Sequence, residues 1–341
     1  MPKTSQRCPD VSVVIVNYNG QGMLRQCLTT LLTTDYPNID ITVVDNASTD
    51  NSITKIQDLL AANPRIQLIQ NPQNVGHAEG CNIGARHSSG GYLVFLDNDI
   101  MFNDKHWLRE LVNVMENDAS VGLAQAKIVL AQDNNRLEYV CLAVDGLGSW
   151  AANYGSDAKM FNEDFEVLAA SSGCCITRRD VFNKVGGFDA DYFIYDDDTD
   201  LSMRIRLLGY HVLFVSSAVV IHRGGVLRGV SGFMLFHSSK NRLCTALKNY
   251  ELRNVCWRFP VLSFFTLLVS AGFFVVKQHE EAKATLNGAV YPLFNLRKIW
   301  TKRLLFQPKR RVKDSELVNS GFVRKDFQFT LQDLRLKLQH M

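Results

Sequence analysis

The sequence predicts an α/β fold with a doubly wound, mostly parallel sheet, and three observations lead to this class. Apolar runs rich in β-branched residues recur in the first hundred residues, and segments with helical spacing separate them. Such runs are typical of strands buried on both faces, and strand–helix alternation favours parallel pairing. Polar clusters follow the runs directly, at the sheet edge where open α/β folds bind ligands. The expected strands cover residues 11–16, 39–44, 66–69 and 92–96.

The segments between these runs fit helices. Apolar residues recur at helical spacing from Met23 to Leu32 and again from Ile53 to Leu60. Residues 74–86 open a third helix with glycines at regular steps, which permits close approach of a ligand or of a neighbouring strand. A later helix is expected over residues 201–208, ended by Gly209, and the apolar run at 213–221 is expected to be a further strand.

Composition supports a large globular domain with an appendage. The chain has 341 residues, of which 46% are hydrophobic and 21% charged, and its net charge of +3 hides an asymmetry. Residues 221–341 hold 21 of the 37 lysines and arginines but 7 of the 34 acidic residues. An acidic front half suits a cation-dependent site, whereas a basic back half suits anionic lipid or nucleic acid. The eight cysteines form no CxxC pair and no apolar targeting segment opens the chain, so we expect reduced, mostly buried thiols in the cytoplasm.

Carboxylates gather at two places that suit chemistry. Asp97 and Asp99 lie at a strand end with one residue between them, a pattern that suits a hard divalent cation. Four carboxylates then fall within residues 196–200, which is unfavourable unless a cation, a proton or a helix N-terminus compensates. The alternative for this run is a solvated helix cap in which Asp200 pairs with Arg204. Asp45 likewise has two interpretations, as a ligand of a base or ribose and as the cap of the following helix.

Together these motifs resemble family 2 glycosyltransferases with the GT-A fold, and most closely the rhamnosyltransferase-like enzymes of bacterial surface polysaccharide assembly. The resemblance covers roughly residues 10–315 and rests on a combination of short motifs. These are Val11–Gly20, Val44–Asp50, Asn74–Asn82, Asp97-Asn98-Asp99, Ser172–Arg179, Val185–Asp189, Tyr195–Arg204 and Val219–Gly225.

The resemblance implies a role for each matched residue. Asp198 matches the catalytic base, and Asp197 remains the alternative because many family members have glutamate there. The expected cofactor is a divalent metal, Mg²⁺ or Mn²⁺, on Asp97, Asp99 and His222, although a lone histidine at a strand end is commonly structural. The residues expected to bind the nucleotide-sugar donor are Asn17, Asp45 (on the nucleobase), Asn74, Gly76, Asn82, Asp97 and Arg204.

The implied function is that of an inverting, metal-dependent glycosyltransferase with a nucleotide-sugar donor, for which dTDP-rhamnose is the first candidate. The acceptor is expected to be a lipid-linked saccharide or a polysaccharide in cell-surface glycan synthesis. Residues 1–228 are expected to form the catalytic domain, with a donor half at about 1–120 and an acceptor half at about 121–228. Near the acceptor, Trp150 or Tyr154 either stacks on a sugar ring or packs in the core. Asp196 is expected to be solvated.

Residues 229–341 are expected to form a mainly helical, membrane-associating region. Residues 259–276 are uncharged and 18 long, the lower limit for a membrane span. We expect peripheral docking on the cytoplasmic face of the cell membrane, with a single span or an ordinary buried helix as alternatives. The basic segment 297–313 either binds anionic headgroups or forms a solvated face. The alternating tail at 326–331 and 334–338 predicts short strands.

Three other classes of protein are disfavoured. A nucleotidyltransferase needs a glycine-rich basic loop after the first strand, and Asn17-Tyr18-Asn19-Gly20 has no lysine nearby. A nucleic-acid-binding protein leaves the acidic front unexplained, and the basic segment lacks interleaved aromatic residues, so no nucleic-acid partner is expected. An inactive membrane scaffold conflicts with the intact carboxylates Asp97, Asp99 and Asp198. The oligomeric state does not follow from the sequence.

Overall fold

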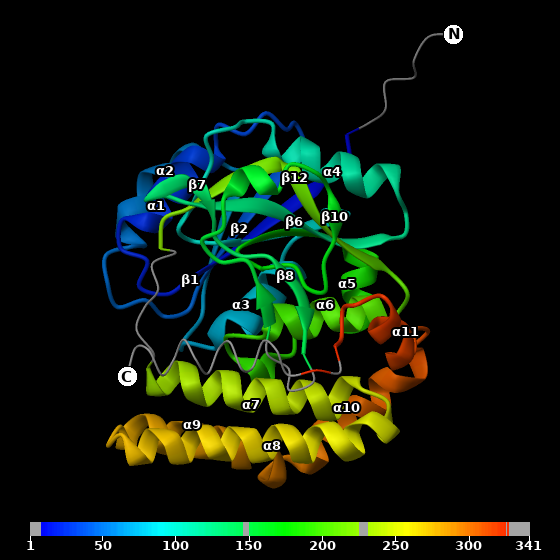
Figure 1. The fold of residues 1–341 in the computed structure, drawn as a ribbon. Coiled ribbons are helices and arrows are strands. Elements are labelled where there is room, and N and C mark those ends of the chain that lie inside the picture. The colour runs from blue at the N-terminus through cyan, green and yellow to red at the C-terminus, as the bar shows by residue number, and fades with distance from the viewer. Residues whose placement is uncertain (1–7, 146–149, 225–230, 325, 327–341) are drawn as a thin grey trace.

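The computed structural model describes residues 8–145, 150–224, 231–324 and 326. Figure 1 shows an α/β domain above a layer of long helices formed by the C-terminal third of the chain. Within the described residues, ten strands form one sheet, and its main path runs β10-β12-β6-β11-β4-β1-β2-β3.

The first half of the sheet is parallel, as predicted. It consists of β1 (Val11–Asn17), β2 (Ile39–Asp45), β3 (Ile66–Gln70) and β4 (Tyr92–Asp97). Each strand extends one residue beyond its predicted end, to the polar residue that follows. The register pairs Asn17 with Asp45 and Val16 with Asp97, so the polar side chains gather at one edge.

The second half of the sheet is mixed, which the sequence did not indicate. The central β11 (Cys174–Arg178) is antiparallel to both β4 and β6 (Val121–Leu130), whereas β12 (His211–His222) is parallel to β6. The two-residue β5 (Ile100–Met101) pairs with the end of β12 and sets Ile100 opposite His222. This pairing brings the loop after β4 next to the end of β12. The remaining strands are β7 (Asp133–Leu137), β8 (Cys141–Val144), β9 (Trp150–Ala152) and β10 (Phe165–Glu166).

Helices cover both faces of the sheet. The glycines of α3 (Gly76–Arg86) serve its packing on β1, because a Cβ at Gly80 would lie 2.8 Å from Val16 and one at Gly84 2.2 Å from Val14. Of the two predicted uses of these glycines, close approach to a strand is therefore the one observed. The other helices of the domain are α1 (Met23–Leu31), α2 (Gln57–Ala62), α4 (Trp107–Asn117), α5 (Arg179–Val185) and α6 (Asp197–Leu207).

The C-terminal layer begins with α7 (Gly232–Asn249), which lies beneath the domain, and α8 (Leu252–Val275) and α9 (His279–Phe294) pack outside it (Figure 1). Two further helices, α10 (Leu296–Phe306) and α11 (Asp314–Asn319), lead back to the domain. In the described residues, α8 is the one helix long and apolar enough to cross a membrane, and 22% of its most apolar window is buried. The predicted apolar segment is thus a helix within a multi-helix layer. Most of the alternating tail lies outside the described residues.

Part of the basic segment pairs with the domain and part contacts the C-terminal layer, while Arg297, Lys309, Arg311 and Lys313 remain exposed. Lys302 lies 2.5 Å from Asp191 and also pairs with Asp189, and Lys298 lies 2.5 Å from Asp191. Arg303 donates to the carbonyl oxygens of Leu247 and Tyr250, and Arg310 pairs with Asp314. Opposite charge on the buried side explains this arrangement, since Asp189 and Asp191 belong to the acidic front of the chain.

Candidate active site

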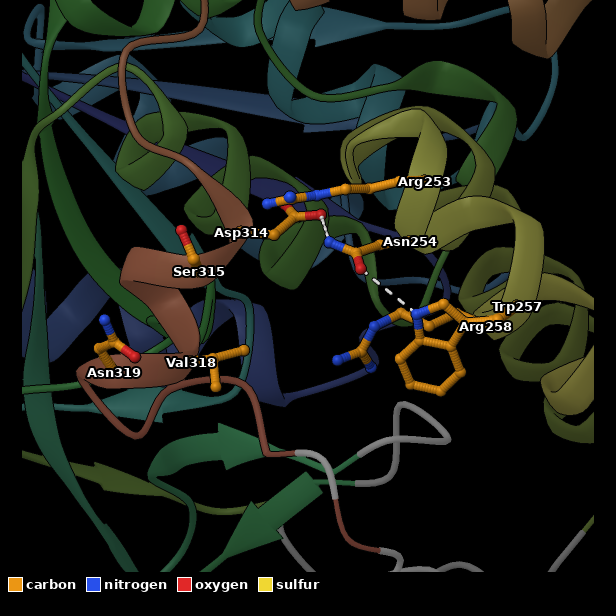
Figure 2. Close-up of a pocket in the computed structure, with 8 residues that line it drawn as sticks. All are labelled: Arg253, Asn254, Trp257, Arg258, Asp314, Ser315, Val318 and Asn319. Carbon is orange, nitrogen blue, oxygen red and sulfur yellow. Dashed lines mark hydrogen bonds between the residues drawn. The ribbon is translucent and has the colours of Figure 1, made fainter.

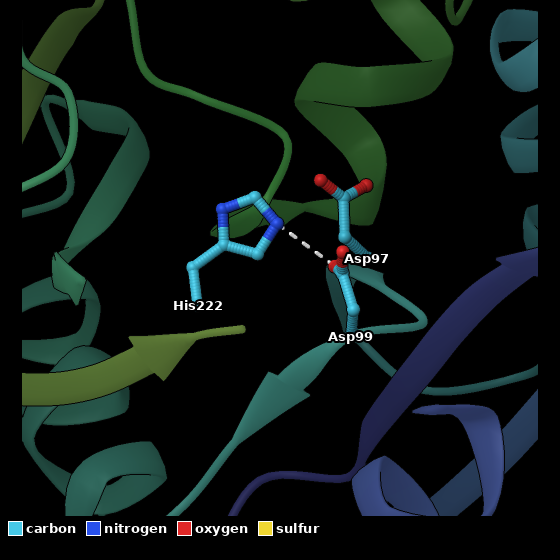
Figure 3. Close-up of side chains that lie close together, drawn as sticks. All are labelled: Asp97, Asp99 and His222. Atoms are coloured by element: carbon cyan, nitrogen blue, oxygen red, sulfur yellow. Dashed lines mark ion pairs between the residues drawn. The ribbon is translucent and has the colours of Figure 1, made fainter. Parts of the chain in front are cut away.

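Three predicted metal ligands lie together at the edge of the sheet. Asp97 ends β4, Asp99 follows it, and His222 ends β12; one ligand atom of each lies within 4.8 Å of the others. Figure 3 shows His222 Nε2 facing Asp99, and its distance to Asp99 Oδ1 is 2.9 Å. A Cβ at Gly224 would lie 2.0 Å from Asp99 Oδ2, so the small residue leaves room for this carboxylate. Two carboxylates and one imidazole form a donor set that fits Mg²⁺ or Mn²⁺.

Glu138 holds the other side of this histidine and was missed in the sequence. Its carboxylate pairs with His222 Nδ1, while Nε2 faces Asp99. Burial by itself lowers the pKa of His222, but the hydrogen bonds to Asp99 and Glu138 raise it to about 11. A carboxylate behind a ligating histidine fixes the orientation of its ring and raises its basicity. Glu138 lies between β7 and β8, where no sequence motif indicated a site.

His77 on α3 lies between two groups of side chains. One is the metal group, which consists of Asp97, Asp99 and His222, and the other is the acidic run at residues 196–200. His77 Nδ1 lies 2.7 Å from Asp197 Oδ2, and its Nε2 lies 3.7 Å from Asp97 Oδ1. Burial lowers the pKa of His77, but Cys81 and the Asp197 carboxylate outweigh burial and raise it well above its ordinary value. The motif Asn74–Asn82 contains this residue, but no role was predicted for it, because only the fold brings α3 to the start of α6.

Asp197 and Asp198 occupy different environments. Asp197 is 3% exposed and is held by His77. Asp198 accepts from the backbone N–H of Thr199 at 2.7 Å and of Ser172 at 3.3 Å. Burial and the neighbouring Asp197 raise the pKa of Asp198 to about 7, against the effect of those two hydrogen bonds.

Two other members of the acidic run differ from each other. Asp196 is not solvated as predicted, because its Oδ2 atom is buried and burial raises the pKa of the carboxyl to about 7. Asp200 is fully buried and pairs with Arg204 at 2.8 Å and with Lys248 at 2.9 Å. The predicted Asp200–Arg204 pair is confirmed. Arg204 is itself buried and also donates to the carbonyl of Val185, so the structure does not bring it to the metal group.

Asn17 and Asp45 lie together at the ends of β1 and β2. Asn17 Nδ2 donates to Asp45 Oδ1 at 2.9 Å, and the Ser48 N–H donates to Asp45 Oδ2 at 3.1 Å. Asp45 is 2% exposed and caps the turn that ends at Ser48, rather than the helix, which starts later. An open pocket of about 590 Å³ lies between the loops that follow β1 and β2, and neither Asn17 nor Asp45 lines it. Its lining residues are Gln21, Thr49, Asp50, Asn51, Thr54 and Lys55.

Three other residues that were predicted to bind the nucleotide-sugar donor, Asn74, Gly76 and Asn82, lie at the start of α3 or within it. Asn74 Oδ1 accepts from the Gly76 N–H at 2.9 Å. Gly76 has a φ of +84°, and a Cβ there would lie 2.5 Å from the carbonyl oxygen of Phe193. Asn82 exchanges two hydrogen bonds of 2.9 Å with the backbone of Phe188, so its amide faces that loop. In this structure, Gly76 and Asn82 support the segment before the acidic run.

A second pocket, of about 500 Å³, lies between α8 and α11 (Figure 2). Asn254 donates to Asp314 at 2.5 Å and accepts from Trp257 Nε1 at 3.3 Å. This pocket shares no residue with the metal group or the acidic run.

The side chain of Trp150 lies outside the described part of the structure, and Tyr154 is 41% exposed. Cys174 and Cys175 are buried free thiols, as expected for packing residues.

Comparison with known proteins finds relatives of this chain and solved structures that resemble it. A search of curated proteins finds the O-antigen biosynthesis protein RfbC of Myxococcus xanthus, 26% identical over 227 residues, which are 64% of this chain and 18% of that protein. An uncharacterized glycosyltransferase of Haemophilus influenzae is 31% identical over 144 residues, covering 39% of this chain and 57% of that protein. The chain thus matches less than two thirds of the length of either relative.

Solved structures share the fold. A mannosyltransferase from Pyrobaculum calidifontis in complex with GDP-Man and Mn²⁺ superposes with a TM-score of 0.55 and 18% identity, over 89% of this chain and 86% of that one. GalNAc-T7 with UDP, GalNAc and Mn²⁺ gives 0.60 and 18% identity, over 86% of this chain and 58% of that one. The α/β domain therefore has a GT-A-like fold.

The family model described as Glycosyl transferase family 2 matches residues 12–186, just over half of the chain. The matched segment contains β1 from its second residue, β2 to β4, the Asp97–Asp99 pair, His77 and Glu138. The chain therefore belongs to glycosyl transferase family 2.

Proposed function

We propose that this chain is an inverting, metal-dependent glycosyltransferase that moves a sugar from a nucleotide-sugar donor to an acceptor hydroxyl. The observation that carries the proposal is the position of His77. Its ring lies 3.7 Å from Asp97 in the metal group and 2.7 Å from Asp197 in the acidic run. Groups suited to stabilise a leaving diphosphate and groups suited to accept a proton therefore line one site.

Asp97, Asp99 and His222 would hold the metal. A divalent cation bound there neutralises negative charge on the diphosphate of the donor. Glu138 keeps the His222 ring turned with Nε2 toward Asp99, so the chain itself fixes the geometry of the ligand set.

Asp198 is the proposed base. The acceptor oxygen forms a bond to the anomeric carbon, the bond from that carbon to the diphosphate oxygen breaks, and the hydroxyl proton passes to the Asp198 carboxylate. A pKa of about 7 suits a general base that works near neutral pH. Asp197 is less suited because it is 3% exposed and already accepts from His77. A single displacement of this kind inverts the anomeric configuration.

The nucleotide of the donor is proposed to lie at the ends of β1 and β2. The open pocket between the loops that follow β1 and β2 supports this placement. Asn74, at the start of α3, is proposed to border the nucleotide. Asp45 is 2% exposed, so its contact with the nucleobase of the donor requires a shift of the loop around it. dTDP-rhamnose is the first candidate donor, and the related O-antigen protein supports a role in cell-surface glycan synthesis. In this proposal, residues of about 1–120 form the half of the domain that binds the donor, and residues of about 121–228 form the half that binds the acceptor.

The acceptor is proposed to be a lipid-linked saccharide, reached by peripheral docking on the inner face of the cell membrane. Many large apolar side chains are exposed on the outer helices, which is unusual for a purely soluble surface. They include Phe264, Leu267, Leu268, Phe274, Val275, Leu286, Leu293, Phe294, Leu296, Leu304 and Leu305. Docking suits α8 better than a span because it packs within the layer; for example, its Ser270 donates to the Ala282 carbonyl on α9 at 2.7 Å.

The proposal is tested with the purified full chain and a panel of UDP-, GDP- and dTDP-sugars. Release of nucleoside diphosphate is measured with Mn²⁺, with Mg²⁺ and with EDTA, and with or without a membrane extract as acceptor source. We expect turnover of at least one donor, lost in EDTA. No turnover of any donor under all of these conditions would contradict the proposal.

A further inference from the structure

The loop before α6 has an unusual backbone. Phe193, Tyr195 and Asp196 have φ values of +67°, +64° and +56°. Positive φ is uncommon for residues other than glycine, and such conformations cost on the order of 1–3 kcal/mol each when they are strained. Contacts from outside the loop must therefore hold it, and the loop ends at the two carboxylates of the proposed site.

One side chain of the C-terminal layer meets this loop at three points. Asn241 on α7 is fully buried, and its Nδ2 lies 3.1, 2.9 and 2.7 Å from the carbonyl oxygens of Tyr192, Ile194 and Tyr195. The amide nitrogen has two N–H bonds to share among three acceptors. For all three carbonyl oxygens to point at this nitrogen, the backbone of the loop must turn sharply, which agrees with the positive φ values.

The opposite side of the loop rests on α3. The Ala78 N–H donates to the carbonyl of Phe193 at 3.2 Å, and Gly76 leaves room for that carbonyl. The neighbouring His77 holds Asp197. The loop is thus clamped between a helix of the family 2 segment and a helix of the C-terminal layer.

We infer that Asn241 is a positioning residue that holds Asp197 and Asp198 in place for transfer. The inference rests on the proposed function, in which Asp198 is the base. It assigns the C-terminal layer a part in the catalytic site in addition to any contact with a membrane.

The test compares full-length Asn241→Ala and Asn241→Asp with a matched control, Ser270→Ala. Asn241→Asp keeps the shape of the side chain but replaces the donor with an acceptor. Ser270→Ala removes a buried hydrogen bond from the same layer without reaching the loop. If the alanine variant does not fold, Asn241→Ser keeps a small hydroxyl donor at the position.

Three quantities are measured: hydrogen exchange of the amides of residues 192–200, affinity for UDP, GDP and dTDP with Mn²⁺, and turnover at saturating donor. In both Asn241 variants we expect faster exchange at 192–200, nucleotide affinity close to wild type, and turnover lower by roughly 10- to 100-fold. A general loss of stability would not separate nucleotide affinity from turnover in this way.

Exchange at 192–200 equal to that of Ser270→Ala would overturn the inference, and so would faster exchange with unchanged turnover. Absence of turnover in the wild-type chain would instead contradict the proposed function. The exchange result alone would then decide whether Asn241 holds the loop.

Discussion

His77 Nδ1 and Asp197 Oδ2 lie 2.7 Å apart, although 120 residues separate them in the chain. The same ring approaches Asp97 with its other nitrogen, at 3.7 Å. A single imidazole therefore connects the carboxylate pair after the parallel strands with the carboxylate pair that begins α6. This contact makes the two groups parts of one site.

Replacement of His77 by phenylalanine should impair this connection. Asp197 would remain buried without its hydrogen-bond donor, which costs about 1–3 kcal/mol of the free energy of unfolding. Turnover at saturating donor should fall as well, because Asp198 is adjacent to the displaced carboxylate. Urea unfolding and initial rates measure the two effects. The control is His87→Phe, at the exposed C-terminal end of the same helix; equal effects of the two substitutions would argue against a role for His77.

Glu138→Gln should weaken metal binding without removing a ligand. The glutamine cannot accept from His222 as strongly, so the ring is less well oriented and less basic. Loss of such a partner lowers metal affinity by roughly 10- to 100-fold. Titration with Mn²⁺ in the presence of a nucleoside diphosphate measures the change, and Glu163→Gln, on an exposed loop, is the matched control. Unchanged Mn²⁺ affinity in Glu138→Gln would show that His222 is not a ligand or does not depend on Glu138.

The pH dependence of turnover should report Asp198. Burial and Asp197 raise the pKa of Asp198 to about 7 in the folded chain. A base must be deprotonated to act, so turnover at saturating donor should rise about tenfold per pH unit up to about pH 7 and level off above it. Because the pKa of Asp198 is higher in the folded chain than in the unfolded chain, stability falls as pH rises from the unfolded value to about 7, and the loss levels off above that pH. Asp198→Asn should therefore gain stability over wild type at pH 8 and not at pH 4; a pH-independent difference would contradict the assigned environment.

Membrane docking should depend on the exposed apolar residues of the outer helices. Phe274→Asp combined with Leu293→Asp should reduce flotation of the full chain with vesicles of phosphatidylglycerol, because both side chains are more than half exposed on α8 and α9. Met160→Asp is the control, since Met160 is 78% exposed on the catalytic domain. Equal flotation of all three proteins, or no flotation of the wild type, would exclude this docking surface.

Local sequence patterns predicted the parallel half of the fold well. Continuous β-branched runs identify strands buried on both faces, and each of the first four strands begins at its predicted residue and ends one residue later than predicted. The positions of Asp97, Asp99 and His222 followed from the family resemblance, and the structure brings them together. The antiparallel β11 was missed because its five residues lie outside the regular alternation of strands and helices that identified the first four strands.

Contacts between distant segments were not predictable from these patterns. His77 lies in the Asn74–Asn82 motif without a predicted role, Glu138 lies in no motif, and only the fold sets them beside Asp197 and His222. Asp196 was expected in solvent, but its Oδ2 atom is buried, and burial raises the pKa of the carboxyl to about 7. The basic segment was expected to bind headgroups or to form a solvated face, and the pairs of Lys298 and Lys302 with Asp191 were not foreseen. A charged residue in the sequence does not show whether it is solvated or paired, or with which residue it pairs.

The central claim is that one site binds the donor through its metal group and performs the transfer through Asp198. The most direct measurement compares Asp99→Asn with Asp198→Asn, by calorimetric titration of nucleoside diphosphate with Mn²⁺ and by turnover of the same samples. We predict that Asp99→Asn loses metal-dependent nucleotide binding, whereas Asp198→Asn retains it and loses transfer. Wild-type transfer in Asp198→Asn, or wild-type nucleotide binding in Asp99→Asn, would contradict the account.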